Sequence, residues 1–299
     1  MKSEGFHNRD GLIWYDGQML DWKEANLHIL THALHYASSV FEGERVYSGN
    51  IFKLREHSTR LISSAKIMGF TIPYSIDEID SACIQACEAN NIVDGYVRPI
   101  AWRGSEMMGV SAQDTTIHLA IAVWAWPSYF SPEARNKGIS LKTSLWRRPP
   151  PETAPVHAKA AGLYMICTLA KHDAEKAGYD DALMLDWRGY VVEGTGANFF
   201  MISQDNVINT PPPDCFLNGI TRQTVIQLAK DRGYKIVERH IQPEELQSAH
   251  EIFVTGTAAE VTPVGKIDDL EYEVGPITKI LRKDYEKLVG RSESAISAA

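Results

Sequence analysis

The sequence predicts a two-domain α/β protein. Its 299 residues are 44% hydrophobic and 23% charged, a globular composition with enough chain for a large core and two domains. Strand patterns that alternate every second residue are mixed with helical patterns that repeat every three or four residues. Residues 127–137 contain prolines, serines and mixed charge, as an inter-domain linker does. We therefore expect a small N-terminal domain over residues 1–126 and a larger C-terminal domain over residues 138–299.

Composition excludes several functional classes. The net charge of −8 and the pI near 5.7 argue against nucleic acid as the main partner. Residues 1–17 are charged and lack the apolar segment of a secretory signal, and the longest apolar run, 117–126, is too short to span a membrane. The cysteines have no Cys-x-x-Cys spacing, which predicts free thiols: Cys83, Cys87, Cys167 and Cys215. We expect a soluble, cytoplasmic protein without membrane contact.

The first domain opens with a hairpin signal, Asp16-Gly17, between two short apolar runs. The helix that follows the second hairpin carries apolar residues at three- and four-residue steps and ends at Gly69. Tyr96 and Arg98 lie two residues apart on a predicted strand and so point to the same side. The expected elements are a second hairpin at 44–54, helices at 55–69 and 76–90, and strands at 95–104 and 116–126.

The second domain alternates strands with helices. Its two candidate anion sites are the amides at the start of the helix that follows Asn218-Gly219, and the small residues from Thr255 to Glu260 after a strand. A plain helix start is the alternative for the first of these. The expected elements are strands at 139–146, 181–187, 190–193, 197–202, 235–240 and 251–255, and helices at 160–178, 218–233, from 243, and 275–288.

One lysine has an unusual environment. Lys159 lies among small and apolar residues, from Val156 to Gly162, and the nearest carboxylate before it is Glu152. Desolvation lowers the pKa of an amine and makes its neutral, nucleophilic form available, so Lys159 could form a Schiff base with an aldehyde. The alternative is a lysine at a helix start that extends its amine into solvent.

Three histidines have helical spacing. His28, His32 and His35 could share one helix face and bind a metal ion. No carboxylate follows in a His-Glu-x-x-His arrangement, which favours hydrogen-bonded core or pocket-edge histidines instead. The pair Gly194-x-Gly196 lacks the third glycine of a dinucleotide-binding loop.

In this order, seven segments resemble the fold-type IV (class IV) pyridoxal-phosphate aminotransferases, most closely the bacterial branched-chain amino acid aminotransferases. The resemblance runs from Leu12 to about Leu288. The segments are 32–36 with 40–43, 55–57 with 60–61, 96–99, 158–160, 193–194, 217–222 and 255–260.

The resemblance implies a D-amino acid aminotransferase-like fold with pyridoxal 5'-phosphate between the two domains. Lys159 would hold the cofactor and move the proton between the substrate Cα and the cofactor C4′. Glu193 would keep the pyridine nitrogen protonated, and Tyr164 would donate to the phenolic oxygen. The phosphate would be bound by Arg60, the amides of Ile220 and Thr221, and Thr257.

The implied reaction is the transamination of leucine, isoleucine and valine with 2-oxoglutarate by a ping-pong mechanism. Arg98 would pair with the distal carboxylate of glutamate, and the amides of Thr257 and Ala258 with the α-carboxylate. The resemblance also implies a homodimer or a hexamer built as a trimer of dimers. The pocket for the aliphatic side chain would be formed by Tyr36, Phe41, Tyr96, Trp126, Tyr129 and Tyr164.

Some positions depart from the family pattern: Glu44, Leu163, Ala197 and Ala37-Ser38. Glu44 matters most, because it could place negative charge near the pocket mouth and alter selectivity. Within the family, D-amino acid aminotransferases, (R)-selective amine transaminases and aminodeoxychorismate lyases are alternatives, but Tyr96-x-Arg98 with Met108-Gly109-Val110 favours the branched-chain type. Outside it, the alternatives are a metal-dependent hydrolase that uses the three histidines and a non-catalytic relative.

Overall fold

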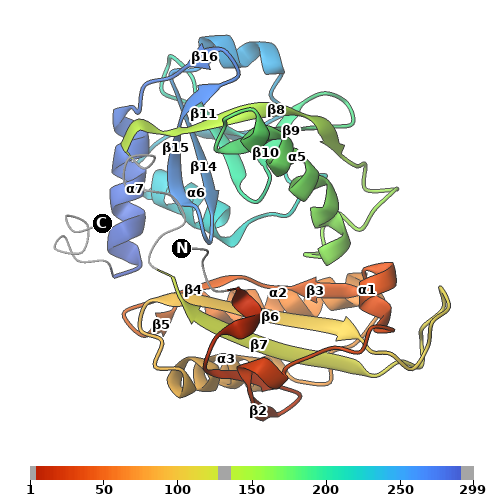
Figure 1. The fold of residues 1–299 in the computed structure, drawn as a ribbon. Coiled ribbons are helices and arrows are strands. Elements are labelled where there is room, and N and C mark those ends of the chain that lie inside the picture. The colour runs from red at the N-terminus through yellow and green to blue at the C-terminus, as the bar shows by residue number, and fades with distance from the viewer. Residues whose placement is uncertain (1–4, 127–135, 291–299) are drawn as a thin grey trace. The chain divides into compact units, whose positions relative to one another are not determined.

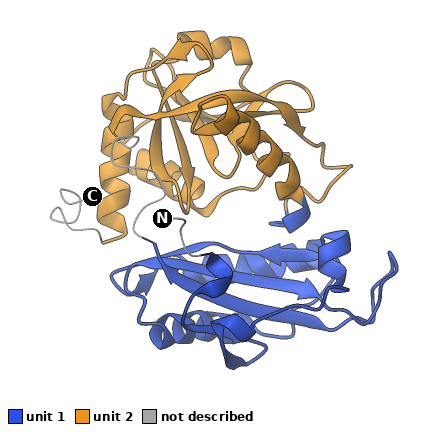
Figure 2. Ribbon diagram, viewed as in Figure 1, with its two compact units in different colours: residues 1–127, 158–162 blue, residues 128–157, 163–299 orange. Residues whose placement is uncertain are grey.

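The computed structural model describes residues 5–126 and 136–290, and the chain splits into two compact units (Figure 2). Unit 1 comprises residues 1–127 together with Ala158–Gly162, and unit 2 comprises the rest. The segment Ala158–Gly162 groups with unit 1 although it follows the expected domain boundary. The expected linker, 127–137, lies largely outside the described residues.

The described part of unit 1 forms a seven-stranded antiparallel sheet with short and long helices (Figure 1). The strand order is β2-β1-β7-β6-β4-β5, and β3 also pairs with β6. The strands are β1 (Leu12–Tyr15), β2 (Gln18–Asp21), β3 (Ser39–Phe41), β4 (Glu44–Tyr47), β5 (Asn50–Ile51), β6 (Gly95–Arg103) and β7 (Ile117–Ala125). The helices are η1 (Phe6–Asn8), η2 (Trp22–Glu24), α1 (His32–Tyr36), α2 (Leu54–Ile67) and α3 (Ile76–Ala89).

The core of unit 1 lies between this sheet and the two long helices. Leu61 of α2 and Ile79 of α3 are fully buried in one cluster with Val97 and Leu119 of the central strands. The helix α3 begins at a capping box, in which Ser75 and Glu78 satisfy each other's backbone amides. Both predicted hairpins and both predicted helices are therefore confirmed, because local signals and tertiary burial agree.

The strand path through β3 and β4 is interrupted at Glu42-Gly43. Phe41 pairs with Ile100 and Glu44 with Val97, so the interruption faces Pro99 of β6. A proline has no N–H to donate, and regular pairing cannot continue across it. The remaining backbone bond there runs from the Glu42 amide to the Pro99 carbonyl at 2.8 Å. This break lets the Glu42 side chain leave the regular strand pattern.

Unit 2 contains a nine-stranded sheet within its described residues (Figure 1). The strands are β8 (Ile139–Arg148), β9 (Asp181–Asp186), β10 (Val191–Gly194), β11 (Asn198–Ile202), β12 (Ile208–Thr210), β13 (Ile236–Glu238), β14 (Glu251–Gly256), β15 (Glu260–Ile267) and β16 (Leu270–Glu271). The helices are η3 (Ala161–Leu163), which begins in unit 1, and α5 (Tyr164–Lys176), α6 (Ile220–Asp231), η4 (Pro243–Ser248) and α7 (Pro276–Leu288). β12, β15 and β16 have no counterpart among the expected strands.

Six of the described strands of unit 2 close into a ring. The path β10-β9-β8-β15-β14-β11 is completed by a pairing of β10 with β11, between Glu193 and Asn198. Each of the six strands contributes buried apolar side chains to one cluster, among them Leu141, Phe199 and Val254. Closure removes exposed strand edges from this part of the sheet and fixes where each strand ends.

Helices and side-chain networks hold the outside of the ring. α5 packs against β9 and β10 through Cys167, Ala170 and Ala174. The buried Glu251 carboxylate accepts hydrogen bonds from the first amides of α7, Ile277 and Thr278, and so caps that helix.

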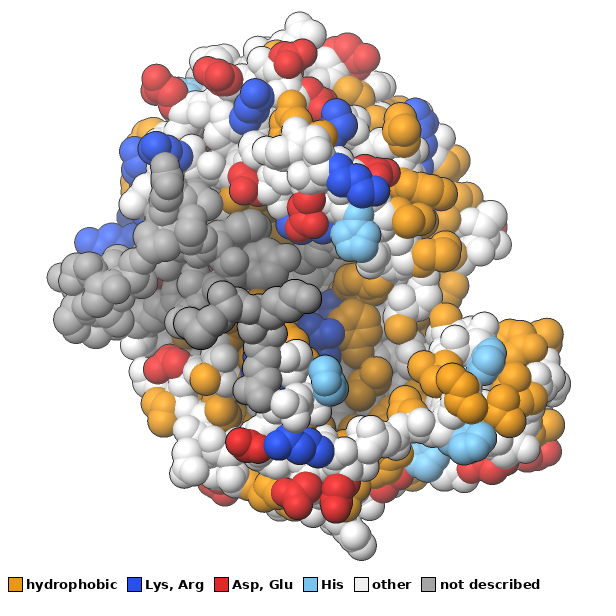
Figure 3. Space-filling model, in the orientation of Figure 1, with side chains coloured by type: hydrophobic (Ala, Val, Ile, Leu, Met, Phe, Trp, Pro, Cys, Tyr) orange, Lys and Arg blue, Asp and Glu red, His pale blue; other side chains and the backbone are white. Residues whose placement is uncertain are grey.

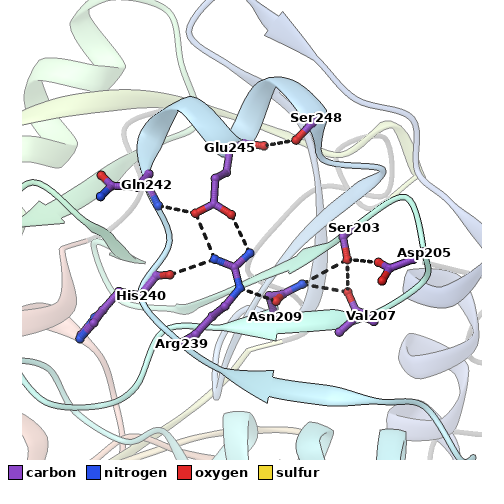
Figure 4. Close-up of polar contacts among 9 residues, drawn as sticks. All are labelled: Ser203, Asp205, Val207, Asn209, Arg239, His240, Gln242, Glu245 and Ser248. Carbon is purple, nitrogen blue, oxygen red and sulfur yellow. Dashed lines mark hydrogen bonds and ion pairs between the residues drawn. The ribbon is translucent and has the colours of Figure 1, made fainter.

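A surface network ties β12 and β13 to η4 (Figure 4). Arg239 donates to both Glu245 carboxylate oxygens and to the Asn209 side chain, which in turn donates to Ser203. Such a fork-to-fork pair fixes the angle at which η4 leaves the sheet.

The structure can be compared with the expectations about the cysteines and about membrane-spanning segments. All four cysteines are free, as predicted, and all four are buried. No helix in residues 5–126 or 136–290 is long and apolar enough to cross a membrane.

Glu44 lies inside unit 1 rather than at a surface. The residue is 0% exposed, and its neighbours include Glu42, Asp80 and Cys83. Among the described residues, neither carboxyl oxygen of Glu44 has a hydrogen-bond partner. Burial, together with the charges of Glu42 and Asp80, raises the pKa of Glu44 well above 4.5. The hypothesis that Glu44 places charge near a pocket mouth is therefore wrong, because this side chain is enclosed and its pKa is raised.

We predict that Glu44 makes unit 1 less stable as the pH rises. Its folded-state pKa is raised, so its stabilising effect is complete below the unfolded pKa and is lost as the pH rises through the folded pKa. Urea unfolding of wild type and Glu44→Gln, at a series of pH values rising from 4.5, measures this. Wild type should lose stability relative to Glu44→Gln over that range. An exposed control, Glu88→Gln, should follow wild type, and equal pH profiles for wild type and Glu44→Gln would contradict the prediction.

Candidate functional site

The backbone of Lys159 is fixed within unit 1. The Phe41 amide donates to the Lys159 carbonyl at 3.1 Å, and the Lys159 amide donates to Ser64 Oγ at 3.0 Å. Its neighbour Ala160 forms an isolated β-bridge with Val40. Ala160 is 2% exposed, which explains why the flanking residues are small. The lysine is therefore part of an ordered strand contact and not a solvent-extended residue on a helix.

The Lys159 amine lies near an aromatic and cationic group of residues in unit 1. Its Nζ is 4.9 Å from the Phe41 ring centroid. The Arg98 guanidinium carbon is 4.8 Å from the same ring centroid. Tyr96 accepts a hydrogen bond from Arg98 at 3.3 Å and packs edge-on against Trp126 at 4.7 Å. Four of the predicted substrate-binding residues thus form one group with the lysine.

Two details of this group relate to its chemistry. Within the described part of the chain, Arg98 Nε is buried and has no hydrogen-bond partner, as expected for a donor that a carboxylate ligand would satisfy. Gly43 leaves the space that the Tyr96 hydroxyl fills, since a Cβ at position 43 would lie 1.8 Å from that oxygen.

Arg60 lies in unit 1 beside the interruption of the strand path. Its Nε donates to Glu42 Oε1 at 2.6 Å and its Nη2 donates to Glu42 Oε2 at 2.8 Å. The second carboxylate oxygen also lies 2.7 Å from His57 Nδ1. Burial would raise the pKa of Glu42, but Arg60 and His57 outweigh it and hold that pKa well below its usual range. Glu42 is therefore ionised and paired.

In unit 2, Glu193 is a buried carboxylate with two partners. Arg148 Nε lies 3.0 Å from Glu193 Oε1, and Asn198 Nδ2 donates to Glu193 Oε2 at 3.3 Å. Burial would lower the pKa of Arg148, but Glu193 outweighs it and raises that pKa. Burial also raises the pKa of Cys167, which the Arg148 guanidinium contacts, to about 11. Glu193 therefore lies within ion-pair distance of a guanidinium, which is a permanent cation.

Asn198 also reaches the start of α6. Its Oδ1 accepts from the Gly219 amide at 3.2 Å, and Gly219 is the N-cap of α6 without a side-chain cap. A Cβ at Gly219 would lie 2.1 Å from Asn198 Oδ1, so only glycine fits there. The next residues, Ile220 and Thr221, are buried at the positive end of the helix dipole.

A second turn in unit 2 presents small residues. Thr257 and Ala258 lie in the tight turn between β14 and β15, where Gly256 pairs with Glu260. Across residues 136–290, the buried Thr255 Oγ1 at the end of β14 has no hydrogen-bond partner. Tyr164, the first residue of α5, is half-buried and packs at the edge of the α5 core.

These donors suit the chemistry of pyridoxal 5'-phosphate. Unit 1 supplies an ordered amine for an aldehyde and a guanidinium for a phosphate. Unit 2 supplies an ionised carboxylate for a basic ring nitrogen and an N-terminal helix turn with no side-chain cap for an anion. The residues present therefore fit this cofactor.

Two predicted substrate residues remain. Tyr36 stacks on His32 at 4.6 Å and donates to the Met108 carbonyl at 3.2 Å, and its contact with substrate stays a prediction. Tyr129 lies outside the described residues.

The three histidines do not form a metal site. His32 is buried and its ring nitrogens contact Ser38 and the Gly109 carbonyl, whereas His28 and His35 bond to neighbouring backbone groups. No cluster of potential metal ligands occurs in the described ranges. The expected helical face is absent because α1 spans only His32–Tyr36. The described histidines therefore give no support to the metal-hydrolase alternative.

Sequence reasoning missed the partners of the site carboxylates. Arg148 follows Arg147 at the end of β8, and nothing local shows which of the two is buried. Asn198 lies in a hydrophobic strand, where a buried amide is a signal that could have been used. Glu42 and His57 lie within the segments that carry the family resemblance, but their pairing with Arg60 is visible only in the fold.

Comparison with known proteins identifies the family. A family model described as "Amino-transferase class IV" matches residues 39–267. A protein from Pseudomonas aeruginosa named branched-chain-amino-acid aminotransferase is 44% identical over 295 residues, covering 96% of each chain. Its namesake from Escherichia coli (strain K12) is 40% identical over 282 residues, covering 91% of each chain.

Solved structures agree. The T.th. branched-chain amino acid aminotransferase with pyridoxamine 5'-phosphate has a TM-score of 0.91 at 40% identity, covering 97% of each chain. The same enzyme complexed with N-(5'-phosphopyridoxyl)-L-glutamate has a TM-score of 0.89 at 39% identity, again covering 97% of each chain. These matches confirm the predicted fold-type IV architecture. The chain therefore belongs to the class IV aminotransferases, a family of enzymes that use pyridoxal 5'-phosphate.

Proposed function

We propose that this protein transfers the amino group of branched-chain L-amino acids to 2-oxoglutarate, by two half-reactions in one site. The observation that carries the proposal is the full-length similarity to proteins named branched-chain-amino-acid aminotransferase, at 44% identity over 96% of the chain for the Pseudomonas aeruginosa protein. The ordered Lys159 and the paired Glu193 support it, since both groups are required for this chemistry.

We propose that cofactor-binding residues come from both units. Lys159 holds the aldehyde carbon covalently, and Tyr164 donates to the phenolic oxygen. The phosphate is bound by Arg60, the amides of Ile220 and Thr221, and Thr257. Three features described above support these phosphate contacts: the Arg60 guanidinium, the N-terminal turn of α6 and the small-residue turn after β14.

Proton transfer is assigned to Lys159 and its control to Glu193. Bound pyridoxal phosphate supplies an electron sink for the negative charge that develops at the substrate Cα. The Lys159 amine takes the proton from Cα and delivers it to C4′. Glu193 holds a proton at the ring nitrogen, and the adjacent Arg148 and Asn198 keep its carboxylate ionised and in place.

Substrate recognition is assigned to the aromatic and cationic group of unit 1. Phe41, Tyr96 and Trp126 contact the aliphatic side chain, and Arg98 binds the distal carboxylate of glutamate or 2-oxoglutarate. The buried Arg98 Nε without a partner in residues 5–126 supports this role. The amides of Thr257 and Ala258 bind the α-carboxylate.

We propose a homodimer, alone or as the unit of a hexamer. Figure 3 shows hydrophobic side chains gathered at the end of unit 1 that carries α1, with histidines among them. The exposed apolar residues of this α1 patch are Leu27, Ile29, Leu30, Leu34, Tyr36, Met108 and Val110. A patch of this kind is unusual on a monomer and supports a self-complementary contact.

We predict that L-leucine will change the visible absorbance of the holoenzyme and that 2-oxoglutarate will restore it. Lys159→Ala should abolish this cycle, because the amine that binds the aldehyde and moves the proton is gone. An exposed lysine control, Lys66→Ala, should cycle normally. Absorbance that ignores L-leucine but responds to D-alanine or (R)-1-phenylethylamine would replace the branched-chain assignment by one of the family alternatives.

Arg98→Leu should raise the KM for 2-oxoglutarate by about 10- to 100-fold and change the KM for L-leucine by less than about 3-fold, since only the former has a distal carboxylate. Steady-state kinetics with each substrate varied separately measures the difference. Arg55→Leu, at an exposed arginine of α2, is the control. Equal increases for both substrates would show that Arg98 does not discriminate between them.

Replacing Leu34 and Val110 together by Asp should convert the dimer into a monomer, because two charges cannot be buried unpaired in an apolar interface. Light scattering after gel filtration gives the mass. Ile67→Asp, at an exposed apolar position outside the α1 patch, should leave the mass unchanged. A wild-type mass equal to that of one chain would refute the assembly.

A further inference from the structure

Arg60 is held by a fully buried carboxylate. Glu42 is 0% exposed, and its two oxygens accept from one edge of the Arg60 guanidinium at 2.6 and 2.8 Å. The arginine side chain is 16% exposed, so it is largely but not completely enclosed. A two-point contact of this kind fixes both the position and the plane of a guanidinium.

His57 completes the arrangement from the same helix. It lies one turn before Arg60 on α2, is 1% exposed, and its Nδ1 is 2.7 Å from Glu42 Oε2. Because Glu42 is ionised, Nδ1 must be the protonated nitrogen and must donate. Burial lowers the pKa of His57, Glu42 raises it, and Arg60 and Lys159 lower it again; the net effect is a pKa below the ordinary value, which favours the neutral imidazole. The group therefore contains one anion, one cation and one neutral donor.

The neighbouring carboxyl, Glu44, is a natural contrast. It is as buried as Glu42 and only two residues away, but Glu42 has charged and hydrogen-bonded partners, whereas within residues 5–126 the Glu44 oxygens have no hydrogen-bond partner. The difference follows from the break opposite Pro99, which turns Glu42 toward α2 and leaves Glu44 in the regular pairing of β4.

We propose that Glu42, supported by His57, is a positioning residue that sets the Arg60 guanidinium for the cofactor phosphate. The inference rests on the proposed phosphate role of Arg60. Glu42 does not touch the phosphate; it acts by fixing the guanidinium before the phosphate binds, so that none of the binding free energy is used to order that long side chain. Half-buried Arg60 without this carboxylate would be displaced or disordered.

The test isolates the contribution of the phosphate. Dissociation constants for pyridoxal 5'-phosphate and for pyridoxal are measured by spectroscopic titration of the full chain stripped of cofactor. Both ligands bind Lys159 through the same aldehyde, so the dissociation constant of pyridoxal divided by that of pyridoxal 5'-phosphate reports the contribution of the phosphate alone. The proteins compared are wild type, Glu42→Gln, Glu42→Asp, Glu44→Gln and Arg60→Ala.

Glu42→Gln should reduce this ratio about 10-fold or more, since a neutral amide replaces a charge-assisted, two-point contact. Glu42→Asp keeps the charge on a shorter side chain, so its ratio should lie between those of wild type and Glu42→Gln. If Glu42→Gln does not fold, the ratio for Glu42→Asp tests the proposal. Glu44→Gln, the matched control at a buried carboxyl with a raised pKa, should keep the wild-type ratio. A merely structural role of Glu42 would weaken both ligands equally and leave the ratio unchanged.

The outcomes separate the inference from the proposed function. If Arg60→Ala lowers the ratio but neither Glu42 variant does, the positioning role is refuted and the phosphate role of Arg60 stands. If Arg60→Ala leaves the ratio unchanged, the phosphate role itself is refuted, and with it the positioning role. If wild type binds neither ligand, the proposed function fails.

Discussion

The contact between the Lys159 backbone and the edge of β3 is the constraint from which the unit 1 half of the site follows. Phe41 donates to the Lys159 carbonyl, and Ser64 of α2 accepts from its amide. The residue after Phe41 is Glu42, which reaches Arg60 on the same helix as Ser64. One junction of a strand, a helix and a five-residue segment therefore positions an amine, an aromatic ring and a guanidinium together. Reactive groups held on such rigid elements lose little freedom when a ligand binds.

Three buried carboxyl groups, those of Glu42, Glu193 and Glu44, differ in their electrostatic partners. Glu42 and Glu193 each have an arginine, Arg60 and Arg148, within ion-pair distance, and their desolvation is compensated by charge and hydrogen bonds. Glu44 has no such partner in the described part of unit 1, and its pKa is raised instead. The two carboxyls with proposed roles at the cofactor site thus each have a cationic partner, whereas Glu44, which is equally buried, does not.

Local signals predicted most of the fold, whereas long-range pairing decided the rest. Hairpin turns, helix periodicity and the small residues around Lys159 are encoded within a few residues of one another, so they could be read directly. β15 could not, because a proline and a glycine interrupt its pattern and pairing with β8 and β14 overrides local preference. The histidine spacing around His32 misled because the helix is one turn long. The roles of Arg148 and Asn198, and the raised pKa of Glu44, depend on neighbours distant in sequence.

The closed ring of unit 2 limits the order in which the protein can fold during synthesis. Its first strand, β8, begins at Ile139 and pairs with β9 on one side and with β15, near Ile267, on the other. The ring cannot close until β15 has left the ribosome, close to the end of the chain. Unit 1 needs only Ala158–Gly162 beyond its own continuous stretch. A nascent chain thus completes the lysine-bearing half early and carries it through more than a hundred further residues, roughly ten seconds of synthesis, before the other half can form.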